Sequence, residues 1–541
     1  MVFRNQSPRA GAWWLGLVLF VCLAAPGPAR ADWLSQLVAD AEAWRQAAQI
    51  PGMAMAVVVD DQVVYAGGFG NVSQEVGAAA VDANTVFEIG SCSKAFAAAL
   101  LAVQVDKGRL AWADLAQSRL PSFAMYDAWV SGQFQVQDLL VHHSGLAMQS
   151  LLGMMVLNYP PQRIVPALRY EKPVTSFRTS FAYQNAMYMA ASLLAEPLTG
   201  QSWGEALRET FFTPLGMSRT VTSQAAKNAL QNVALGHMIL ADGGLWTIPG
   251  DWSGNVMSDY ALGAGAIRSS VNDIANWLRL QLSLGSFGGT QLVSTAQMRF
   301  LQAPLALVVD YAQGQDIDYW GPVSYGGGWM YFGFSPQPFL QHGGAVQGFK
   351  ASMGLIPASK AGIVVLTNIG GNFTGVQSLN ARSTTADKIV FHFYDLYMNR
   401  AVTAGQLEEN MARLAALQAE APSAQAAPAG AARAAPPLEQ YCGTYVHPAY
   451  GSFTVSLAGG GLRIALGPDG YTTALLAGDS GFYAYPRDYP TAANLTLPFT
   501  FAFPESGPAT MTLGAVMGFP QGAVFTRIGP VAPVGLLLGD S

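Results

Sequence analysis

Short apolar runs near both ends of a long central region predict the strands of one sheet. Residues 53–59 and 63–68 are two such runs, and the turn at residues 60–61 predicts an antiparallel hairpin. Residues 351–356 and 362–367 form a second pair far along the chain. Strands from distant parts of a sequence that share a sheet are typical of an α+β fold.

Helical periodicity occurs beside and between these strands. Apolar residues recur at helical spacing from 33 to 50, where Pro51-Gly52 predicts the end of a helix, and again at 386–397. The long region 91–335 is expected to be mostly helical. We therefore predict an α+β domain with an antiparallel sheet flanked by helices and a large helical insertion.

A change of composition predicts a second domain. Residues 420–437 consist mostly of Ala and Pro without an apolar period, which predicts a linker, and a short amphipathic helix is expected before it. Residues 438–528 are rich in Gly, Thr, Tyr and Phe in short runs, which predicts a small all-β barrel or sandwich. The expected divisions of the chain are 1–31, 32–400, 401–437 and 438–541.

The first 31 residues predict a signal peptide. Arg4 and Arg9 give a positive start, residues 13–25 form an apolar run, and Ala29-Arg30-Ala31 fits a cleavage site. The run is shorter than the roughly 20 residues that a membrane-spanning helix needs. We therefore expect an exported protein, periplasmic or secreted, with no integral membrane segment after cleavage.

Composition limits the partners and cofactors of the predicted mature chain. Of the 28 Lys and Arg residues, three precede residue 32, so 25 remain against 34 Asp and Glu, a formal charge of −9. This excess of negative charge argues against nucleic acid as a partner. Cys92 and Cys442 lie in different predicted domains and are interpreted as free thiols. No Cys/His cluster has metal-ligand spacing, so no metal or other cofactor is expected.

Ser91 and Lys94 are the strongest candidates for chemistry. They stand at the start of the apolar run 95–102, which predicts a buried helix, and side chains three residues apart share one helical face. A buried lysine is costly unless it is paired or neutral. A neutral amine there could take the hydroxyl proton and make Ser91 a nucleophile. Taken alone, the pair also fits an N-cap serine followed by a surface lysine.

Two further segments carry side chains suited to the same chemistry. Tyr183 could act as a base if it faces Lys94, because a neighbouring ammonium lowers the pKa of a phenol. Asn185 could hydrogen-bond Lys94 or a substrate amide. His342-Gly343-Gly344 precedes a predicted strand, and glycines there would let a substrate backbone approach while a backbone N–H points at an oxyanion. Each segment taken alone also fits a structural role.

Together these segments resemble the serine β-lactamase and penicillin-binding-protein superfamily. They look like its S-x-x-K, Y-x-N and [KH]-x-G motifs, in that order. Further family-like segments are residues 87–91, 138–146, 214–217 and 263–273. The resemblance covers about residues 32–400 and is greatest for the class C branch, which holds cephalosporinases, D-Ala-D-Ala carboxypeptidases, D-aminopeptidases and esterases. The all-β tail resembles the lipocalin-like domain that some of these hydrolases carry.

The resemblance implies catalytic roles for individual residues. Ser91 would be the acylated nucleophile, and Lys94 and Tyr183 would move its proton to the leaving group. Asn185 would position Lys94 and the substrate. The backbone N–H groups of Ser91 and Ala345 would form an oxyanion hole, in which each donor is worth on the order of 3 kcal/mol in the transition state.

The same resemblance places Asn185, His342, Gly344 and Ala345 in substrate binding. Class C β-lactamases usually have a lysine where His342 stands, and its ammonium helps to hold a carboxylate. A histidine with an ordinary pKa of about 6.5 is mostly neutral at pH 7 and gains charge as the pH falls toward about 6. We therefore expect small esters or D-amino-acid amides and peptides as substrates, with β-lactamase or D-Ala-D-Ala carboxypeptidase activity as the alternative.

A different class of function also stays open, namely a penicillin-recognising sensor that is acylated without turnover. The expected partner is a small-molecule or short-peptide substrate, and the C-terminal domain is a candidate surface for homo-oligomerisation. The other histidines are expected to be structural, with His142 and His143 bracing a turn, and Cys92 is expected to be a small core residue.

Overall fold

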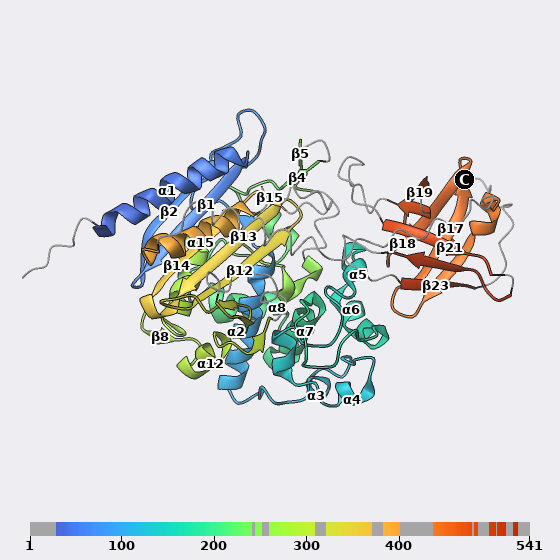
Figure 1. Ribbon diagram of the computed structural model, residues 1–541, viewed down its shortest axis with the longest axis horizontal. Helices are drawn as coiled ribbons and strands as arrows, with labels where there is room; N and C mark the ends of the chain where they lie inside the picture. Colours follow the sequence, from blue (N-terminus) through green and yellow to red (C-terminus); the bar gives the residue numbers. More distant parts are fainter. Residues whose placement is uncertain are drawn as a thin grey trace, which may run out of the picture.

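The computed structural model describes the chain from residue 29 onward, with gaps (Figure 1). The described residues are 29–240, 244–251, 259–308, 321–370, 382, 384–400, 436–478, 481–484, 497–504, 506–514 and 523–528. Most of the predicted signal peptide, together with the short helix and linker predicted before the second domain, lies outside the described residues.

An eight-stranded antiparallel sheet forms the centre of the first domain, in the order β2-β1-β14-β13-β12-β11-β10-β9. Its strands are β1 (Gly52–Val59), β2 (Gln62–Gly70), β9 (Ala306–Leu307), β10 (Val323–Tyr325), β11 (Met330–Phe332), β12 (Phe339–Val346), β13 (Phe349–Ile356) and β14 (Ala361–Thr367). β1 lies beside β14, with Met53 opposite Thr367 and Val59 opposite Ala361. The two distant pairs of apolar runs therefore meet in one sheet, and the predicted α+β class is confirmed.

Helices cover both faces of this sheet (Figure 1). On one face α1 and α15 lie side by side, and Trp33 packs edge-on against Phe393 and Tyr397 with ring centroids 6.0 and 5.2 Å away. On the other face α2 and α11 are joined by the rings of Phe96 and Trp277, stacked 3.7 Å apart. β1 and β14 are buried almost throughout because both of their faces are covered.

Most helices of the first domain, from α2 to α12, lie in the sequence between β2 and β12, and α1 and α15 lie outside this region. Their bounds are α1 (Ala29–Ala47), α2 (Ser93–Asp106), α3 (Ala116–Arg119), α4 (Ala128–Ser131), α5 (Leu152–Val156), α6 (Pro161–Ala167), α7 (Asn185–Thr199), α8 (Trp203–Leu207), α9 (Gln224–Asn228), α11 (Val271–Leu282), α12 (Thr295–Leu301) and α15 (Thr385–Tyr397). Short strands outside the main sheet are β3 (Phe87–Glu88), β4 (His237–Ile239), β5 (Leu245–Thr247), β6 (Arg268–Ser269), β7 (Ser286–Phe287), β8 (Thr290–Gln291) and β15 (Ile369–Gly370).

Two details differ from the sequence-based expectation. The region expected to be mostly helical contributes β9, β10 and β11 to the main sheet, and these strands are only two or three residues long. Runs this short carry no readable period of alternation. The His342-Gly343-Gly344 segment, expected to precede a strand, lies inside β12.

The second domain is a closed eight-stranded barrel, which confirms the predicted all-β tail and decides between the barrel and the sandwich. Its strands are β16 (Gly443–His447), β17 (Gly451–Ala458), β18 (Gly461–Leu466), β19 (Tyr471–Gly478), β20 (Gly481–Ala484), β21 (Leu497–Ala502), β22 (Thr510–Leu513) and β23 (Ala523–Ile528). Alternate residues are buried, among them Tyr445, Phe453, Ile464, Phe499 and Phe525. Closure pairs every edge strand, which removes exposed sheet edges.

The barrel contacts the helical region of the first domain at α5. The Tyr159 hydroxyl donates a hydrogen bond to the Tyr450 carbonyl, and the two rings pack edge-on with centroids 6.0 Å apart. Gly153 in α5 makes room for Tyr450, because a Cβ atom there would lie 2.6 Å from the Tyr450 hydroxyl oxygen. A tyrosine of the barrel is thus fitted into the surface of the first domain.

Two further sequence-based expectations concern membranes and thiols. Across the described ranges, none of the helices has both the length and the apolar character that crossing a bilayer demands. Cys92 and Cys442 are both buried free thiols, as predicted.

Candidate active site

Ser91 lies in a short 3-10 turn, Gly90–Cys92, that leads directly into α2. Gly90 adopts a left-handed φ of +51°, and a Cβ atom there would lie 2.7 Å from the backbone nitrogen of Ala345. Glycine is therefore needed for two reasons, the backbone conformation and the close approach of β12. The turn holds Ser91 half-buried at the end of a helix that is buried from Ser93 to Gln104, as its apolar sequence predicts.

Lys94 is completely buried and makes three polar contacts. Its Nζ lies 3.1 Å from Ser91 Oγ, 2.8 Å from Asn185 Oδ1 and 2.9 Å from the carbonyl oxygen of Ala264. Burial lowers the pKa of Lys94 well below its usual value, because removal from water disfavours the ammonium. A neutral amine has two hydrogens, which the amide and carbonyl oxygens accept, so its lone pair faces the Ser91 hydroxyl.

The orientation of Asn185 at the start of α7 is set by Gln149. The Asn185 Nδ2 group donates a hydrogen bond to Gln149 Oε1 at 2.9 Å, which leaves Oδ1 directed at Lys94. Gln149 was not identified from the sequence, because nothing in its local pattern distinguishes it from a loop residue.

Tyr183 completes the cluster around Ser91. Lys94 Nζ lies 4.6 Å from the centre of the Tyr183 ring. Desolvation raises the pKa of the Tyr183 phenol well above its usual value, although the neighbouring Ser91 side chain acts to lower it. The expectation that a neighbouring ammonium would lower this pKa is therefore wrong for the resting site, since the buried lysine is itself held neutral. The phenol is a proton donor here, and the amine is the stronger base.

β12 brings the third segment beside the turn that holds Ser91. A Cβ atom on Gly344 would lie 1.9 Å from the carbonyl oxygen of Ile89 and 3.1 Å from the Ser91 backbone nitrogen. Only glycine permits this approach, which places the strand segment around Ala345 next to the Ser91 backbone. The three motifs identified in the sequence thus converge on one place.

His342 is buried on β12 with both ring nitrogens engaged. Nδ1 lies 2.6 Å from the Gly343 carbonyl oxygen, and Nε2 lies 2.9 Å from the Tyr325 hydroxyl. Burial, followed by repulsion from Lys94, lowers the pKa of His342 to about 3. The expectation that His342 gains charge near pH 6 is therefore wrong, because this histidine stays neutral down to a much lower pH.

His142 is closer to the site than its sequence context indicated. It does brace a turn, with a φ of +60° and an Nδ1 that accepts a hydrogen bond from the Gln184 backbone at 3.0 Å. Its ring centre also lies 4.3 Å from that of Tyr183 and 4.6 Å from that of Tyr325. Burial lowers the pKa of His142 well below its usual value, so it supports the Tyr183 ring as an uncharged side chain.

The remaining histidines and Cys92 have the structural roles expected of them. His143 bonds the buried Asp138 at 2.7 Å, and His237 bonds the Asn368 carbonyl oxygen at 2.7 Å. The Cys92 thiol donates to the His342 carbonyl oxygen at 3.3 Å. Burial raises the pKa of this thiol to about 12, so Cys92 is not available as a second nucleophile.

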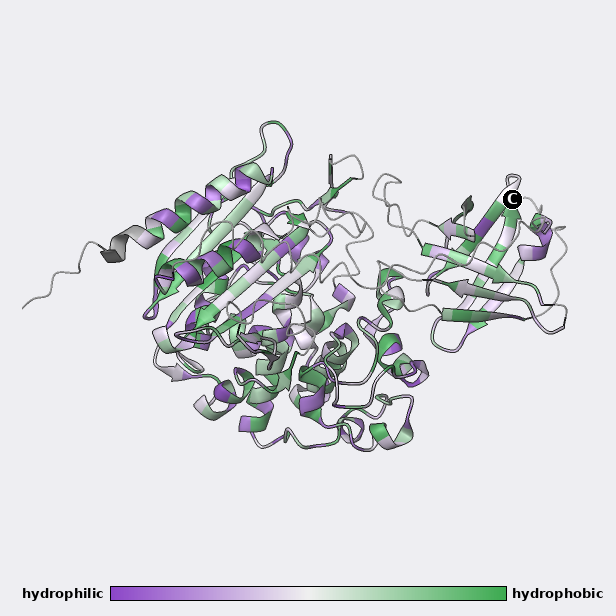
Figure 2. Ribbon diagram, in the orientation of Figure 1, coloured by the Kyte–Doolittle hydropathy of each residue, from purple (hydrophilic) through white to green (hydrophobic). Residues whose placement is uncertain are grey.

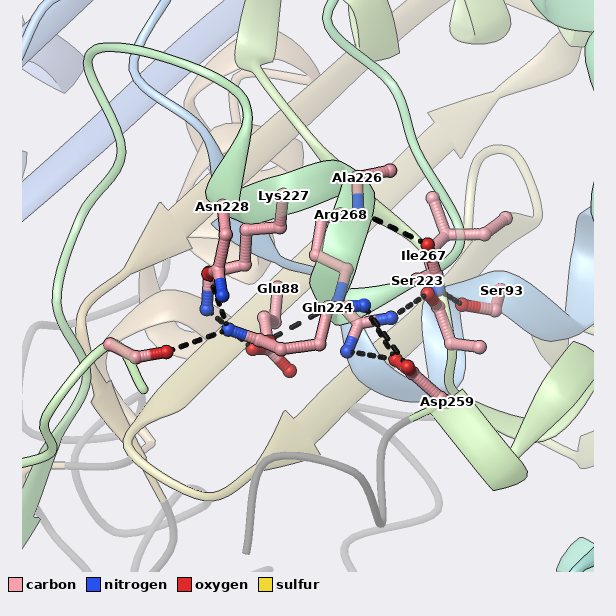
Figure 3. A network of polar contacts seen from close by, with 12 residues as sticks. Glu88, Ser93, Ser223, Gln224, Ala226, Lys227, Asn228, Asp259, Ile267 and Arg268 are labelled. Atoms are coloured by element: carbon pink, nitrogen blue, oxygen red, sulfur yellow. Dashed lines mark hydrogen bonds and ion pairs between the residues drawn. The ribbon is translucent and has the colours of Figure 1, made fainter. Parts of the chain in front are cut away.

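A buried network of charged side chains supports the segment before Ser91 (Figure 3). Glu88 pairs with Lys227 of α9 at 2.7 Å and lies 3.9 Å from Arg268 of β6. Arg268 in turn pairs with Asp259 at 2.6 Å. Because β3 and β6 place Glu88 opposite Arg268, the network ties the approach to Ser91 to a second part of the helical region.

Lys227→Met is expected to lower the free energy of unfolding by about 3–5 kcal/mol, because Glu88 would keep its buried charge but lose its partner at 2.7 Å. Urea denaturation measures this change. The matched control is Arg208→Met, which removes the cation of an exposed pair with Glu209 at 3.7 Å and should cost at most about 1 kcal/mol. Equal effects of the two substitutions would show that Arg268 alone holds Glu88.

Comparison with known proteins agrees with this geometry. The Beta-lactamase family model matches residues 32–386. The chain is 26% identical over 342 residues to the Unguisins hydrolase ungD of Aspergillus violaceofuscus, a match that covers 59% of this chain and 58% of that protein. It is 29% identical over 336 residues to Penicillin-binding protein 4 of Amycolatopsis lactamdurans, covering 61% of this chain and 84% of that protein.

Two solved structures share the fold. The octameric penicillin-binding protein homologue from Pyrococcus abyssi aligns with a TM-score of 0.58 at 19% identity, over 91% of this chain and 99% of that chain. The D-amino acid amidase from Ochrobactrum anthropi SV3 aligns with a TM-score of 0.54 at 18% identity, over 68% of this chain and 99% of that chain. With the family match spanning most of the first domain and its three motifs gathered around one serine, the chain belongs to the Beta-lactamase family of serine hydrolases.

Proposed function

We propose that the protein is an exported serine hydrolase that works through an acyl-enzyme on Ser91, with small uncharged esters or D-amino-acid amides as its preferred substrates. The observation that carries this proposal is the set of contacts at Lys94. Asn185 and Ala264 accept the two hydrogens of a neutral amine, so the lone pair is left for the Ser91 hydroxyl 3.1 Å away.

Acylation follows from these contacts. Lys94 takes the hydroxyl proton while Ser91 Oγ attacks the carbonyl carbon of the substrate. The backbone N–H groups of Ser91 and Ala345 stabilise the oxyanion as the tetrahedral intermediate forms. Tyr183 then gives its proton to the leaving oxygen or nitrogen and recovers one from Lys94, which releases the alcohol or amine and leaves the acyl group on Ser91.

Deacylation repeats the same proton transfers with water as the nucleophile. The Lys94–Tyr183 pair takes a proton from the water as it attacks the ester carbonyl, and Ser91 Oγ recovers a proton as it leaves. Turnover is favoured over a stable acyl adduct, because the neutral Lys94 amine stays beside Ser91 Oγ and can take part in the proton transfers that deacylation needs. A sensor that only becomes acylated is therefore the less favoured class.

The neutral His342 supports an uncharged substrate. In place of the usual lysine, this position offers a ring whose two nitrogens already make hydrogen bonds. A substrate carboxylate there would lose water without gaining a cation, which is unfavourable. The named amidase and hydrolase relatives are compatible with amide or ester cleavage. Similarity to a penicillin-binding protein supports β-lactamase or D-Ala-D-Ala carboxypeptidase activity as the second candidate function.

Export is part of the proposal and rests on the sequence of the first 31 residues. The positive start, the apolar run and the Ala29-Arg30-Ala31 site support cleavage by a signal peptidase. N-terminal sequencing of the protein recovered from the periplasm or medium should begin at Asp32. Recovery of the uncleaved chain from the cytoplasm would contradict export and leave the proposed chemistry untouched.

A substrate panel tests the proposed activity directly. Turnover of p-nitrophenyl acetate or D-alanine p-nitroanilide is expected to exceed that of nitrocefin by at least about tenfold in kcat/KM at pH 7.5, since a charge-assisted hydrogen bond worth about 1.5–3 kcal/mol is missing for the carboxylate. Both the burst and the steady state are measured. Faster turnover of nitrocefin would favour the β-lactamase alternative, and a burst without turnover would favour the sensor.

A further inference from the structure

Tyr450, in the turn between β16 and β17, joins the second domain to the segment around α5. It is buried against Tyr159, whose hydroxyl donates to its carbonyl oxygen, and Gly153 has no side chain where the Tyr450 hydroxyl lies. A second turn of the barrel, between β18 and β19, approaches the other end of α5. A Cβ atom on Gly467 there would lie 2.9 Å from the Leu157 carbonyl oxygen. The barrel therefore contacts α5 at its start and at its end.

The chain just before α5 reaches the candidate active site. It contains Gln149, whose Oε1 accepts a hydrogen bond from Asn185 Nδ2 at 2.9 Å. The Gln149 backbone nitrogen donates to the Tyr183 carbonyl oxygen at 2.8 Å, and its own carbonyl oxygen accepts from the Leu152 backbone at 3.0 Å. A single short stretch of chain thus joins two residues of the site to the contact with the barrel.

The backbone of this stretch is in an unfavourable conformation. Gln149 and Leu151 have left-handed φ angles of +56° and +63°, which are uncommon for residues that carry a Cβ atom. Such residues keep this conformation only where the surrounding structure holds them. On one side the stretch is held by the hydrogen bonds of Gln149, and on the other by the packing of α5 against Tyr450. Loss of the barrel contact should therefore let the stretch relax and move Gln149 with it.

We propose that Tyr450 is a positioning residue, which holds α5 from the second domain so that Gln149 keeps the Asn185 amide in its reactive orientation. The inference rests on the proposed function and makes the barrel part of the catalytic unit. Asn185 Oδ1 accepts from Lys94 Nζ at 2.8 Å while its Nδ2 group is turned toward Gln149. A rotated amide would present hydrogens instead, and they would occupy the amine lone pair that the Ser91 hydroxyl needs.

Gly153→Ala tests the contact from the side of the first domain. Alanine favours a helix more than glycine does, so α5 itself is not weakened, whereas the new Cβ atom would lie 2.6 Å from the Tyr450 hydroxyl oxygen. The kcat for p-nitrophenyl acetate, normalised to folded protein, is expected to fall at least about fivefold, the effect of losing one ordinary hydrogen bond. Adding Tyr450→Phe removes the clashing oxygen and should restore most of the loss.

Tyr445→Phe is the matched control for this rescue. It removes a hydroxyl from the same barrel, but that hydroxyl donates to the Tyr441 carbonyl oxygen at 2.9 Å, within the second domain. Alone it should leave kcat at the wild-type value, and it should not restore activity to Gly153→Ala. Rescue by both tyrosine substitutions, or by neither, would overturn the inference, because the loss would then not depend on Tyr450.

The path through Gln149 is tested by a double substitution. Gln149→Ala should itself lower kcat by a similar factor, and adding Gly153→Ala should lower it little further, since both changes remove the same restraint on Asn185. Losses that multiply would contradict this path. An unchanged kcat in Gly153→Ala would overturn the inference, while ester turnover by the wild type would still uphold the proposed function. Absence of ester and amide turnover in the wild type would instead overturn the proposed function.

Tyr159→Phe tests the same contact if Gly153→Ala does not fold, because it adds no atoms. It removes the hydrogen bond to the Tyr450 carbonyl oxygen and should lower kcat about two- to fivefold. This loss should disappear when Gln149 is already replaced by Ala. An unchanged kcat in Tyr159→Phe, or the same loss in the Gln149→Ala background, would overturn the role given to Tyr450.

Discussion

Ser91→Ala is expected to lower kcat for p-nitrophenyl esters by several powers of ten, the size of loss that removal of a nucleophile causes in other serine hydrolases. The substitution removes the oxygen that lies 3.1 Å from Lys94 Nζ. The nearest thiol, that of Cys92, is buried and bonded to the His342 carbonyl oxygen. Labelling by a fluorophosphonate or a fluorescent penicillin should disappear as well.

Ser144→Ala is the control for this experiment. The Ser144 side chain is also buried, but its Oγ accepts a hydrogen bond from the Leu146 backbone in a turn. This variant should keep its labelling and most of its turnover. Undiminished turnover in Ser91→Ala would refute the assignment of the nucleophile.

Lys94→Ala and Tyr183→Phe are expected to lose roughly 10²–10⁴-fold in kcat each, and the double variant should be little worse than the worse single one. Lys94 lies 3.1 Å from Ser91 Oγ and over the Tyr183 ring, and in the proposed mechanism both groups pass the same proton, so removal of either interrupts one transfer path. Tyr183→Phe keeps the ring that packs on His142 and beneath Lys94, so it isolates the effect of the hydroxyl. Strictly additive losses would show that the two groups act separately.

The pH dependence separates the two roles further. Burial lowers the pKa of Lys94 and desolvation raises that of Tyr183, so at neutral pH the amine is the base and the phenol is the acid. The rate should therefore fall as the pH drops through the lowered pKa of Lys94, since an ammonium cannot take the Ser91 proton. Tyr183→Phe should keep this acidic limb of the profile. Loss of that limb in Tyr183→Phe would contradict the assignment of the base.

The hydropathy of the helices and strands agrees with their burial in the structure. In Figure 2 the strands of the central sheet are mostly pale to green, whereas α1 and α15 on its outer face alternate between hydrophobic and hydrophilic residues along their length. Alternation on α1 fits a helix with one buried face, and a uniformly apolar α2 fits a helix surrounded by the core. These patterns are local, which is why β1, β14, α2 and α15 could be predicted within a few residues.

The sequence alone also determined which residues meet around Ser91. Ser91 and Lys94 share a helical face through their spacing, which needs no tertiary information. Tyr183, Asn185 and His342 were placed with them by resemblance to a family, and the fold brings all of them together. Short runs separated by turns predicted an all-β barrel or sandwich, and the structure shows that it is a closed barrel.

Only the tertiary structure decided the charge states and the supporting contacts of the site. The pKa values of Tyr183 and His342 were misjudged, because they depend on how much water the surrounding elements exclude, a quantity that no local pattern records. Gln149 and Tyr325 were missed because their partners lie 36 and 17 residues away. Spacing along the chain fixes which side chains share a helix, whereas burial and long-range contacts fix which of them hold a proton.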